Sequence, residues 1–297
     1  MGVRDILANL IPPQKARLIY GAYDIVGDLV VTKVPAELDE YEREVGEAIH
    51  LAHPGVRRVF RVIGETKEIE RNRLLRAIWP ESPQNGRDGG THTSGWSRTI
   101  YREQGCRFVV DVEKVFFTPR LSYERMRVAR QVKSREVAAN LFGGVGTYAI
   151  IIAKVCPEVE RTYSIDVNPN ADELSRENVV INKCWNKVMP ILGDAKIVCR
   201  DELKGVCDRV IMPLPENAKY FLDSAVTALK EGCECTINFY AEISGKEVEN
   251  EVHKVVDETK KRIVSSGAKS CEAICWRIVR EVGARRYHVA IDLRVVK

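Results

Sequence analysis

From residue 114 onwards, short apolar runs alternate with longer segments whose apolar positions recur every three or four residues. The short runs predict strands and the longer segments predict helices, because an amphipathic helix repeats with a period of about 3.6 residues. The predicted strands are 136–142, 162–167, 187–193, 208–212, 233–240, 275–283 and 286–296, and the predicted helices are 118–132, 146–156, 171–183, 220–230 and 247–267. Such alternation predicts an α/β fold with a mostly parallel, doubly wound sheet and an antiparallel edge.

The first part of the chain is patterned as mixed α+β. We expect a strand with a glycine break at 25–35, a helix at 38–53, strands at 56–64 and 71–79, and two more strands around a Gln104–Gly105 turn within 99–117. Residues 81–97 are rich in Gly, Ser, Asn and Pro without an apolar period, which predicts a loop. We therefore divide the chain into a small α+β domain, 1–113, and a larger domain, 114–297.

Composition limits the kinds of partner and the cellular location that we expect for this protein. The net charge of +4 permits a nucleic-acid partner without requiring one. No apolar run approaches the roughly 18 residues of a membrane span, and the N-terminal apolar stretch is interrupted by charge. We expect a cytoplasmic, monomeric protein without membrane association. The nine cysteines contain no C-x₂-C pair, so we expect no metal site, and Cys271 and Cys275 are predicted to lie one turn apart on a helix.

A glycine-rich turn follows the first strand of the larger domain. Gly143, Gly144 and Gly146 let the backbone turn tightly and approach a ligand closely. Asp166 ends the next strand, about 20 positions further on, where a carboxylate suits the two hydroxyl groups of a ribose. Asp194 follows the third strand, where it suits an adenine amino group. Ordinary capping of the following helices is the alternative for both aspartates.

The fourth strand ends abruptly within DRVIMPLPEN, residues 208–217. Pro213 and Pro215 remove two backbone donors directly after the buried run and fix φ near −65°. Ligands of parallel α/β sheets bind at the carboxyl ends of the strands. The stretch therefore predicts a functional loop.

Five segments in a fixed order carry a family resemblance: 115–129, the glycine turn, 164–171, 188–195 and 208–218. Together they resemble the archaeal and eukaryotic class of tRNA (guanine-37 N1) methyltransferases, including its wyosine-pathway branch. Residues 23–35 and 99–117 are similar to the small middle domain of that family. The resemblance implies a Rossmann-like class I S-adenosylmethionine-dependent methyltransferase, preceded by a small RNA-recognition domain. Its implied substrate is position 37 in the anticodon stem-loop of the phenylalanine tRNA.

The resemblance also implies a cofactor site. It places S-adenosylmethionine over the glycine turn, with Asp166 on the ribose and Asp194 near the adenine. The implied cofactor-binding residues are Phe116, Arg120, Phe142, Gly143, Gly144, Val145, Gly146, Asp166, Val167, Asp194 and Ala195.

Catalytic roles follow from the same motifs. The S/T-P-R…E-R motif at the start of the 118–132 helix makes Glu124 the implied base for the guanine N1 proton. An arginine of the small domain stabilises developing charge on O6, and alignment places it at Arg71, with Arg73 as the alternative. The residues alone also allow a simple ion pair between Glu124 and Arg120 on a solvated helix.

Three departures from the family pattern stand out. Asn140 replaces the usual aspartate before the glycine turn, and Gly143-Gly144 replaces Ala-Gly. We also expect the family's additional N-terminal domain, which grips the tRNA elbow, to be absent. The third departure is Pro213, where the guanine-N1 enzymes carry asparagine.

Pro213 bears on the substrate. An asparagine offers a donor and an acceptor to a base edge, whereas proline offers neither. Wyosine-branch enzymes carry proline at this position and methylate a carbon, C7, of the tricyclic demethylwyosine-type base. We hypothesise that Pro213 favours this larger base, so that the substrate is the tricycle, guanine-37 N1, or both.

Two other functions remain open at this stage. One is the aminocarboxypropyl transferase of the same pathway, whose motif after the fourth strand differs. The other is a degenerate methyltransferase fold that only binds RNA, which Asn140 and Pro213 favour and the retained acidic residues oppose. An RNA-binding surface is predicted for the arginines of the small domain with two tryptophans, namely Arg57, Arg58, Arg61, Arg71, Arg73, Arg76, Trp79 and Trp96.

Overall fold

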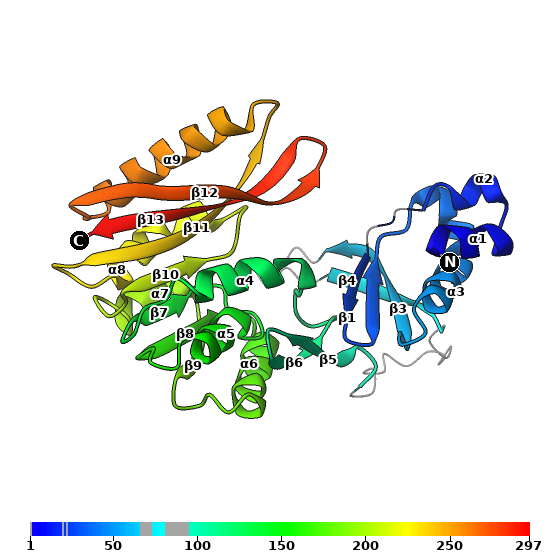
Figure 1. Cartoon of the computed structure of the whole chain (residues 1–297), viewed down its shortest axis with the longest axis horizontal. Coiled ribbons are helices and arrows are strands. Elements are labelled where there is room, and N and C mark those ends of the chain that lie inside the picture. Colours follow the sequence, from blue (N-terminus) through cyan, green and yellow to red (C-terminus); the bar gives the residue numbers. More distant parts are fainter. Residues whose placement is uncertain (1, 20, 22, 66–72, 81–94) are drawn as a thin grey trace. The chain divides into compact units, whose positions relative to one another are not determined.

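The computed structural model describes residues 2–19, 21, 23–65, 73–80 and 95–297. These residues form two compact units, Met1–Arg120 and Leu121–Lys297, in the colours blue to green and green to red of Figure 1. The sequence placed the division slightly earlier, between residues 113 and 114. Each unit is described by itself below.

The described residues of the first unit form a four-stranded sheet, a separate hairpin and three α-helices. The helices are α1 (Val3–Leu10), α2 (Pro13–Ala16) and α3 (Glu42–Ala52), with a 3₁₀ turn, η1 (Ala36–Tyr41), before α3. The sheet has the order β1-β2-β3-β4, with β1 (Tyr23–Val26), β2 (Leu29–Thr32), β3 (Arg58–Glu65) and β4 (Arg73–Trp79). The hairpin consists of β5 (Arg98–Glu103) and β6 (Cys106–Asp111).

The predicted single strand 25–35 was wrong, because the glycine break is a complete hairpin turn. Gly27 has a φ of +59°, so the chain reverses there and β1 pairs antiparallel with β2. The predicted turn at Gln104–Gly105 is confirmed, since both residues have positive φ and join β5 to β6. The helices α1 and α2 were not predicted; their apolar side chains join a core with α3.

The second unit is built on a seven-stranded sheet of order β12-β13-β11-β10-β7-β8-β9. The strands β11, β10, β7, β8 and β9 are parallel, whereas β13 and β12 run antiparallel to them. This confirms the predicted α/β fold with an antiparallel edge. The strands are β7 (Val137–Asn140), β8 (Arg161–Asp166), β9 (Val188–Leu192), β10 (Arg209–Met212), β11 (Glu234–Ser244), β12 (Ser270–Gly283) and β13 (Arg286–Val296).

Helices cover both faces of this sheet (Figure 1). The helices α4 to α6 pack on one face, and α7 to α9 pack on the other. They are α4 (Ser122–Ala129), α5 (Thr147–Val155), α6 (Pro169–Ile181), α7 (Ala195–Asp201), α8 (Leu222–Ala228) and α9 (Val248–Ser265), with 3₁₀ turns η2 (Pro119–Leu121) and η3 (Ala218–Phe221). Buried apolar side chains between the sheet and α7 to α9 form the main core.

Three local predictions in this unit needed correction. The helix predicted from Thr118 begins with η2, and the Thr118 hydroxyl accepts from the Arg120 amide at 3.4 Å, so it caps this turn and α4 starts only at Ser122. The short α7 was missed. Cys271 and Cys275 lie on β12 instead of a helix, because tertiary pairing with β13 decided the state of that segment.

A buried polar cluster fastens α4 to the strands beneath it. Asp292 of β13 accepts from both terminal nitrogens of Arg127, from the Gln131 amide at 2.7 Å and from the Asn238 amide at 2.7 Å. Burial opposes the charge of Asp292, but these hydrogen bonds outweigh it and lower its pKa to about 2. The same guanidinium also binds Glu124 of α4, so one arginine joins a helix to a strand 165 residues away in sequence.

We predict that Asp292→Asn destabilises the protein by about 3 kcal/mol at neutral pH, because removing one partner of a buried ion pair leaves the other charge poorly compensated. The pKa of Asp292 is lower in the folded state than when unfolded, so the contribution of this carboxylate is present above pH 3.8. It is lost as the pH falls towards about 2. Urea unfolding between pH 2 and pH 7 measures both effects.

Glu272→Gln is the matched control for this prediction, because Glu272 forms an exposed ion pair with Arg294 on the same hairpin. Its effect should stay within about 0.5 kcal/mol. Equal effects of the two substitutions would contradict the importance of the buried cluster.

Candidate active site

The glycine turn leaves the carboxyl edge of the sheet open to a ligand. Gly143 follows β7 closely and its amide donates to the Ile165 carbonyl at 2.7 Å, so that an added Cβ would lie 2.2 Å from the Ser164 hydroxyl. Gly144 has a φ of +52° and an added Cβ there would meet no atom within 4 Å. The backbone is therefore packed tightly at one glycine and faces open space at the next.

Asp166 is tied to this turn by its own side chain. One carboxylate oxygen accepts from the Gly144 amide at 2.7 Å, and the other accepts from the Asn168 amide at 3.0 Å. Asn168, and not Asp166, caps α6. The alternative that Asp166 merely caps the next helix is thus wrong, and the structure joins the predicted turn and the predicted carboxylate.

Asp194 does fill the capping role that the sequence left open. Its carboxylate accepts from the Lys196 amide at 2.7 Å at the start of α7, and the residue is exposed at the end of β9. Ala195 beside it is buried, and Val167 after β8 is exposed. A capping carboxylate still presents its second oxygen to solvent, so capping and ligand contact are compatible.

The predicted site also contains a buried donor without a partner. The Asn140 side-chain nitrogen at the end of β7 is buried and makes no hydrogen bond among the described residues, while its oxygen accepts weakly from the Phe142 amide at 3.4 Å. Phe142 packs edge-on against Phe221 at 4.9 Å, and Val145 is buried with its carbonyl bound by the Asn178 amide. An unpaired buried donor is costly, and a polar ligand at this turn would relieve it.

Glu124 is the most confined carboxylate of the set, with a residue exposure of 2%. Arg127 binds both of its oxygens at 2.8 to 3.1 Å, and the Tyr240 hydroxyl donates to Oε1 at 2.6 Å. Burial, with the neighbouring Tyr148 and Glu124, raises the pKa of Tyr240 well above its ordinary value, so this hydroxyl stays a donor. The alternative of a solvated Glu124–Arg120 ion pair is wrong.

The sequence did not indicate these partners of Glu124. Arg127 lies three residues further along α4 and carried a weak signal, because side chains spaced i,i+3 meet on a helix. Tyr240 and Arg277 come from β11 and β12, and no spacing in the sequence connects them to α4. Arg277 approaches Glu124 Oε2 at 3.6 Å.

The proline loop continues the same carboxyl edge. Pro213 follows β10 and is half-buried, and the Leu214 amide turns back to the Met212 carbonyl at 2.8 Å. The Pro215 carbonyl accepts from the Glu242 amide at 3.1 Å, so the loop is fixed to β11. No ladder bond requires an N–H at Pro213, which explains why the strand exit tolerates it.

Other predicted residues lie together within the first unit. Arg120 donates to Asp24 at 2.6 Å, and Arg73 approaches the second oxygen of Asp24 at 3.8 Å. The Arg73 guanidinium lies 4.7 Å from the ring centre of Phe116, which is exposed. Arg71, the preferred charge-stabilising arginine, lies outside the described residues.

The predicted RNA surface is more internally paired than expected. Arg57 forms an ion pair with Asp28. Arg61 and Arg76 both form ion pairs with Glu42. The two tryptophans also have partners. Arg58 makes a cation–π contact with Trp96, and Trp79 stacks on the ring of His50. These contacts hold the arginines in place but compete with phosphate for their charge.

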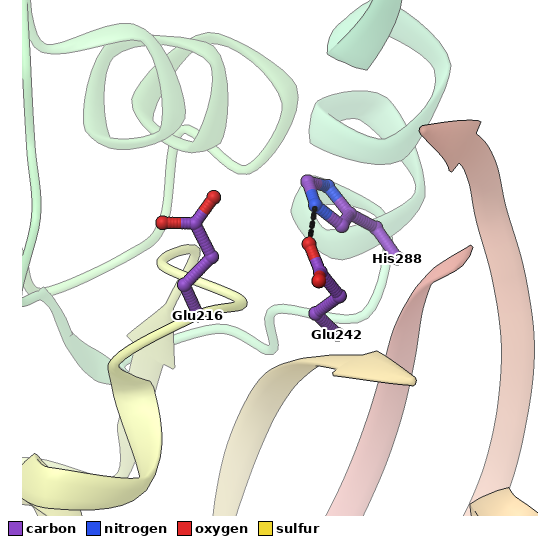
Figure 2. A group of neighbouring side chains, drawn as sticks. All are labelled: Glu216, Glu242 and His288. Carbon is purple, nitrogen blue, oxygen red and sulfur yellow. Dashed lines mark ion pairs between the residues drawn. The ribbon is translucent and has the colours of Figure 1, made fainter. Parts of the chain in front are cut away.

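A group of three titratable side chains lies at the ends of β10, β11 and β13 (Figure 2). Glu216, Glu242 and His288 bring one ligand atom each within 4.8 Å of the others. Arg286 donates to Glu242 at 2.6 Å. Arg280 donates to His288 Nδ1 at 3.2 Å, so the ring proton of His288 is on Nε2. This nitrogen lies 3.4 Å from Glu242 Oε2. Burial lowers the pKa of His288. These contacts engage Glu242 and His288.

Among the described residues, no helix has both the length and the apolar character that crossing a membrane requires.

Comparison with known proteins identifies the relatives of this chain. A family model described as the TRM5/TYW2 methyltransferase domain matches residues 99–266, and one described as the TYW2 N-terminal domain matches residues 3–82. The tRNA (guanine(37)-N(1))-methyltransferase Trm5b of Pyrococcus abyssi is 32% identical over 285 residues, which are 96% of this chain and 78% of the relative. The tRNA 4-demethylwyosine(37)-methyltransferase Taw21 of Saccharolobus solfataricus is 32% identical over 280 residues, 93% of this chain and 94% of the relative.

Solved structures agree. The crystal structure of Trm5b from Pyrococcus abyssi matches with a TM-score of 0.78 and 33% identity, covering 97% of this chain and 78% of that one. A complex of aTrm5 with tRNALeu matches with a TM-score of 0.78 and 31% identity, covering 99% and 78%. The family expected from the ordered motifs is confirmed. With a methyltransferase model across more than half of its 297 residues, this chain belongs to the TRM5/TYW2 family of S-adenosylmethionine-dependent methyltransferases.

Proposed function

We propose that this protein methylates the base at position 37 of tRNA, in the anticodon stem-loop of the phenylalanine tRNA. The observation that carries the proposal is the buried carboxylate of Glu124, held by Arg127 and Tyr240 in the same unit as the open glycine turn. The names of the relatives support position 37, since Trm5b is a guanine-37 enzyme and Taw21 acts on 4-demethylwyosine at that position.

The residues at the glycine turn fit S-adenosylmethionine. Open space above Gly144, the carboxylate of Asp166 and the unpaired Asn140 amide offer a surface, acceptors and a donor to a polar nucleoside ligand. Asp166 would hold the ribose, and Asp194 would lie near the adenine, with Phe142 and Val145 beside the turn. When bound, this cofactor supplies an electrophilic methyl group.

Glu124 suits the role of general base. A carboxylate oxygen offers about two acceptor positions. Arg127 and Tyr240 donate three hydrogen bonds to Oε1 of Glu124 but only one to Oε2, in which the Arg127 Nε–H is shared between both oxygens. The remaining position on Oε2 would accept the proton that guanine N1 loses when N1 takes the methyl group, whose bond to the cofactor sulfur would break and leave a neutral thioether. The proton thus leaves the ring and the base product carries no added charge.

Pro213 is the residue that we connect with the choice of base. It lies at the end of β10, on the same sheet edge as the glycine turn, and it offers no side-chain hydrogen bond. A site without this hydrogen bond holds plain guanine less firmly and accommodates a larger, less polar tricycle. We therefore propose that the tricyclic demethylwyosine-type base is the preferred substrate, with guanine N1 as a second one.

We predict that Pro213→Asn shifts the substrate preference towards plain guanine by about 10-fold, because one regained hydrogen bond is worth about 1–2 kcal/mol. The assay uses two phenylalanine tRNAs that differ only at position 37, one with guanine and one with the demethylated tricycle. Mass spectrometry of the nucleosides gives the ratio of products. An unchanged ratio would contradict the role of Pro213 in substrate choice. A product that carries an aminocarboxypropyl group in place of a methyl group would show that the enzyme is not a methyltransferase.

Binding of the cofactor is tested by Gly144→Ala. Alanine at a φ of +52° costs about 1 kcal/mol of backbone strain and places a methyl group in the open space above the turn. We expect calorimetry to show S-adenosylmethionine binding weakened by at least about 10-fold. Gly205→Ala is the matched control, because Gly205 has a φ of +70°, equally open surroundings and a position after α7. If both variants bind alike, the turn is not the cofactor site.

Glu124→Gln should lower kcat by about 100-fold or more, because an amide cannot take the proton at this position. Binding of S-adenosylmethionine should be unchanged. Arg127 keeps its second partner, Asp292, so that the fold survives the substitution. Single-turnover methylation measures the loss, and Glu251→Gln, on an exposed i,i+3 pair of α9, is the control. Near wild-type turnover of Glu124→Gln would exclude Glu124 as the base.

A further inference from the structure

Arg277 is placed beside Glu124 by the edge strand β12. The residue lies between two register irregularities of β12 against β13, one at Ala273/Cys275 and one at Ile278/Arg280. Such irregularities bend a strand and re-aim its side chains. The Arg277 guanidinium lies 4.8 Å from the ring centre of Tyr123, and its Nη1 lies 3.6 Å from Glu124 Oε2.

The hydrogen bonds of the Glu124 carboxylate come from groups other than Arg277. Arg127 already binds both oxygens at 2.8 to 3.1 Å, and Tyr240 donates at 2.6 Å. At 3.6 Å the Arg277 contact is too long for a hydrogen bond. A guanidinium has five N–H donors, and in the described part of the chain none of those of Arg277 forms a hydrogen bond.

Tyr123 lies beside this arginine at the surface. The tyrosine is 69% exposed, and the Arg277 guanidinium lies over its ring, a cation–π contact that occupies none of the N–H donors of the arginine. Arg277 itself keeps 35% of its side chain exposed. The donors therefore remain available to a ligand that reaches Glu124 from solvent.

The pair presents an acceptor next to a donor. Oε2 of Glu124 is a hydrogen-bond acceptor, and Nη1 of Arg277, which lies 3.6 Å from it, is a hydrogen-bond donor for a ligand. The N1–H and O6 groups of guanine present the opposite order, a donor next to an acceptor, and the tricyclic base keeps the same carbonyl oxygen. We propose that Arg277 is a further catalytic residue, which donates a hydrogen bond to this carbonyl oxygen of the base at position 37.

This inference rests on the proposed function but not on the placement of the small domain. Arg277, Tyr123 and Glu124 all belong to the second unit. The arginine expected from the first unit, Arg71, is not described, and its alternative, Arg73, contacts Asp24 and Phe116. When guanine N1 loses its proton, negative charge develops on O6, and a guanidinium already beside the base would stabilise it without large rearrangement.

The test compares Arg277→Ala and Arg277→Lys with Arg294→Ala in the full-length protein. Arg294 lies on the same hairpin, in exposed ion pairs with Glu234 and Glu272, and its loss should leave methylation unchanged. For Arg277→Ala we expect kcat to fall by about 100-fold at unchanged tRNA affinity, and an intermediate value for Arg277→Lys, which keeps the charge but loses the planar fork. Free guanidinium at millimolar concentration should restore part of the activity of Arg277→Ala and none of that of Glu124→Gln.

The outcomes separate this inference from the proposed function. A wild-type enzyme that transfers no methyl group to position 37 overturns both. An active wild type with kcat of Arg277→Ala equal to that of Arg294→Ala overturns the role of Arg277 alone. If Arg277→Ala loses only tRNA affinity, the arginine serves RNA docking and the catalytic role is rejected. If its unfolding midpoint falls and guanidinium does not restore activity, the arginine serves folding and the catalytic role is likewise rejected.

Discussion

The half-buried guanidinium of Arg127 makes the contacts on which the arrangement of this site depends. It bridges Glu124 on α4 and Asp292 on β13, two carboxylates that would otherwise repel each other in a buried environment. Burial opposes its charge, but both carboxylates raise the pKa of Arg127 far above its ordinary value, so the positive charge is permanent. A short helix of two turns is thereby fixed on an antiparallel pair of strands, and Glu124 has a defined orientation.

The second constraint comes from the backbone at the end of β7. A tight approach at Gly143 and a left-handed residue at Gly144 direct the chain away from the sheet edge, and Asp166 fastens the turn from the next strand. In the proposed site, this backbone shape leaves open space above Gly144, beside the carboxylate of Asp166. The buried Asn140 amide lies at the end of β7, and its donor has no partner among the described residues.

The arginines of the two units differ in how far acidic neighbours engage them. The family pattern pointed to arginines of the small domain, many of which pair with acidic neighbours there. Within the second unit, Arg277 meets Glu124 from the last hairpin, which lies beyond residues 99–266 of the matched methyltransferase domain. Arg277 and Glu124 belong to the same compact unit, so their distance does not depend on where the small domain lies.

The sequence by itself determined the class of fold, the order of the strands in the second unit with all of its helices except α7, and the family. Local periodicity sufficed for this, because the apolar pattern of a buried strand or an amphipathic helix can be recognised within about ten residues. It also located Asp166, the glycine turn and Pro213, which follow strands directly. Tertiary structure alone decided that Cys271 lies on a strand, because β12 extends to Ser270 through its pairing with β13, beyond the predicted strand 275–283. It alone decided the partners of Glu124 as well, because Tyr240, Arg277 and Asp292 reach α4 only through a sheet assembled from strands more than 100 residues away in the chain.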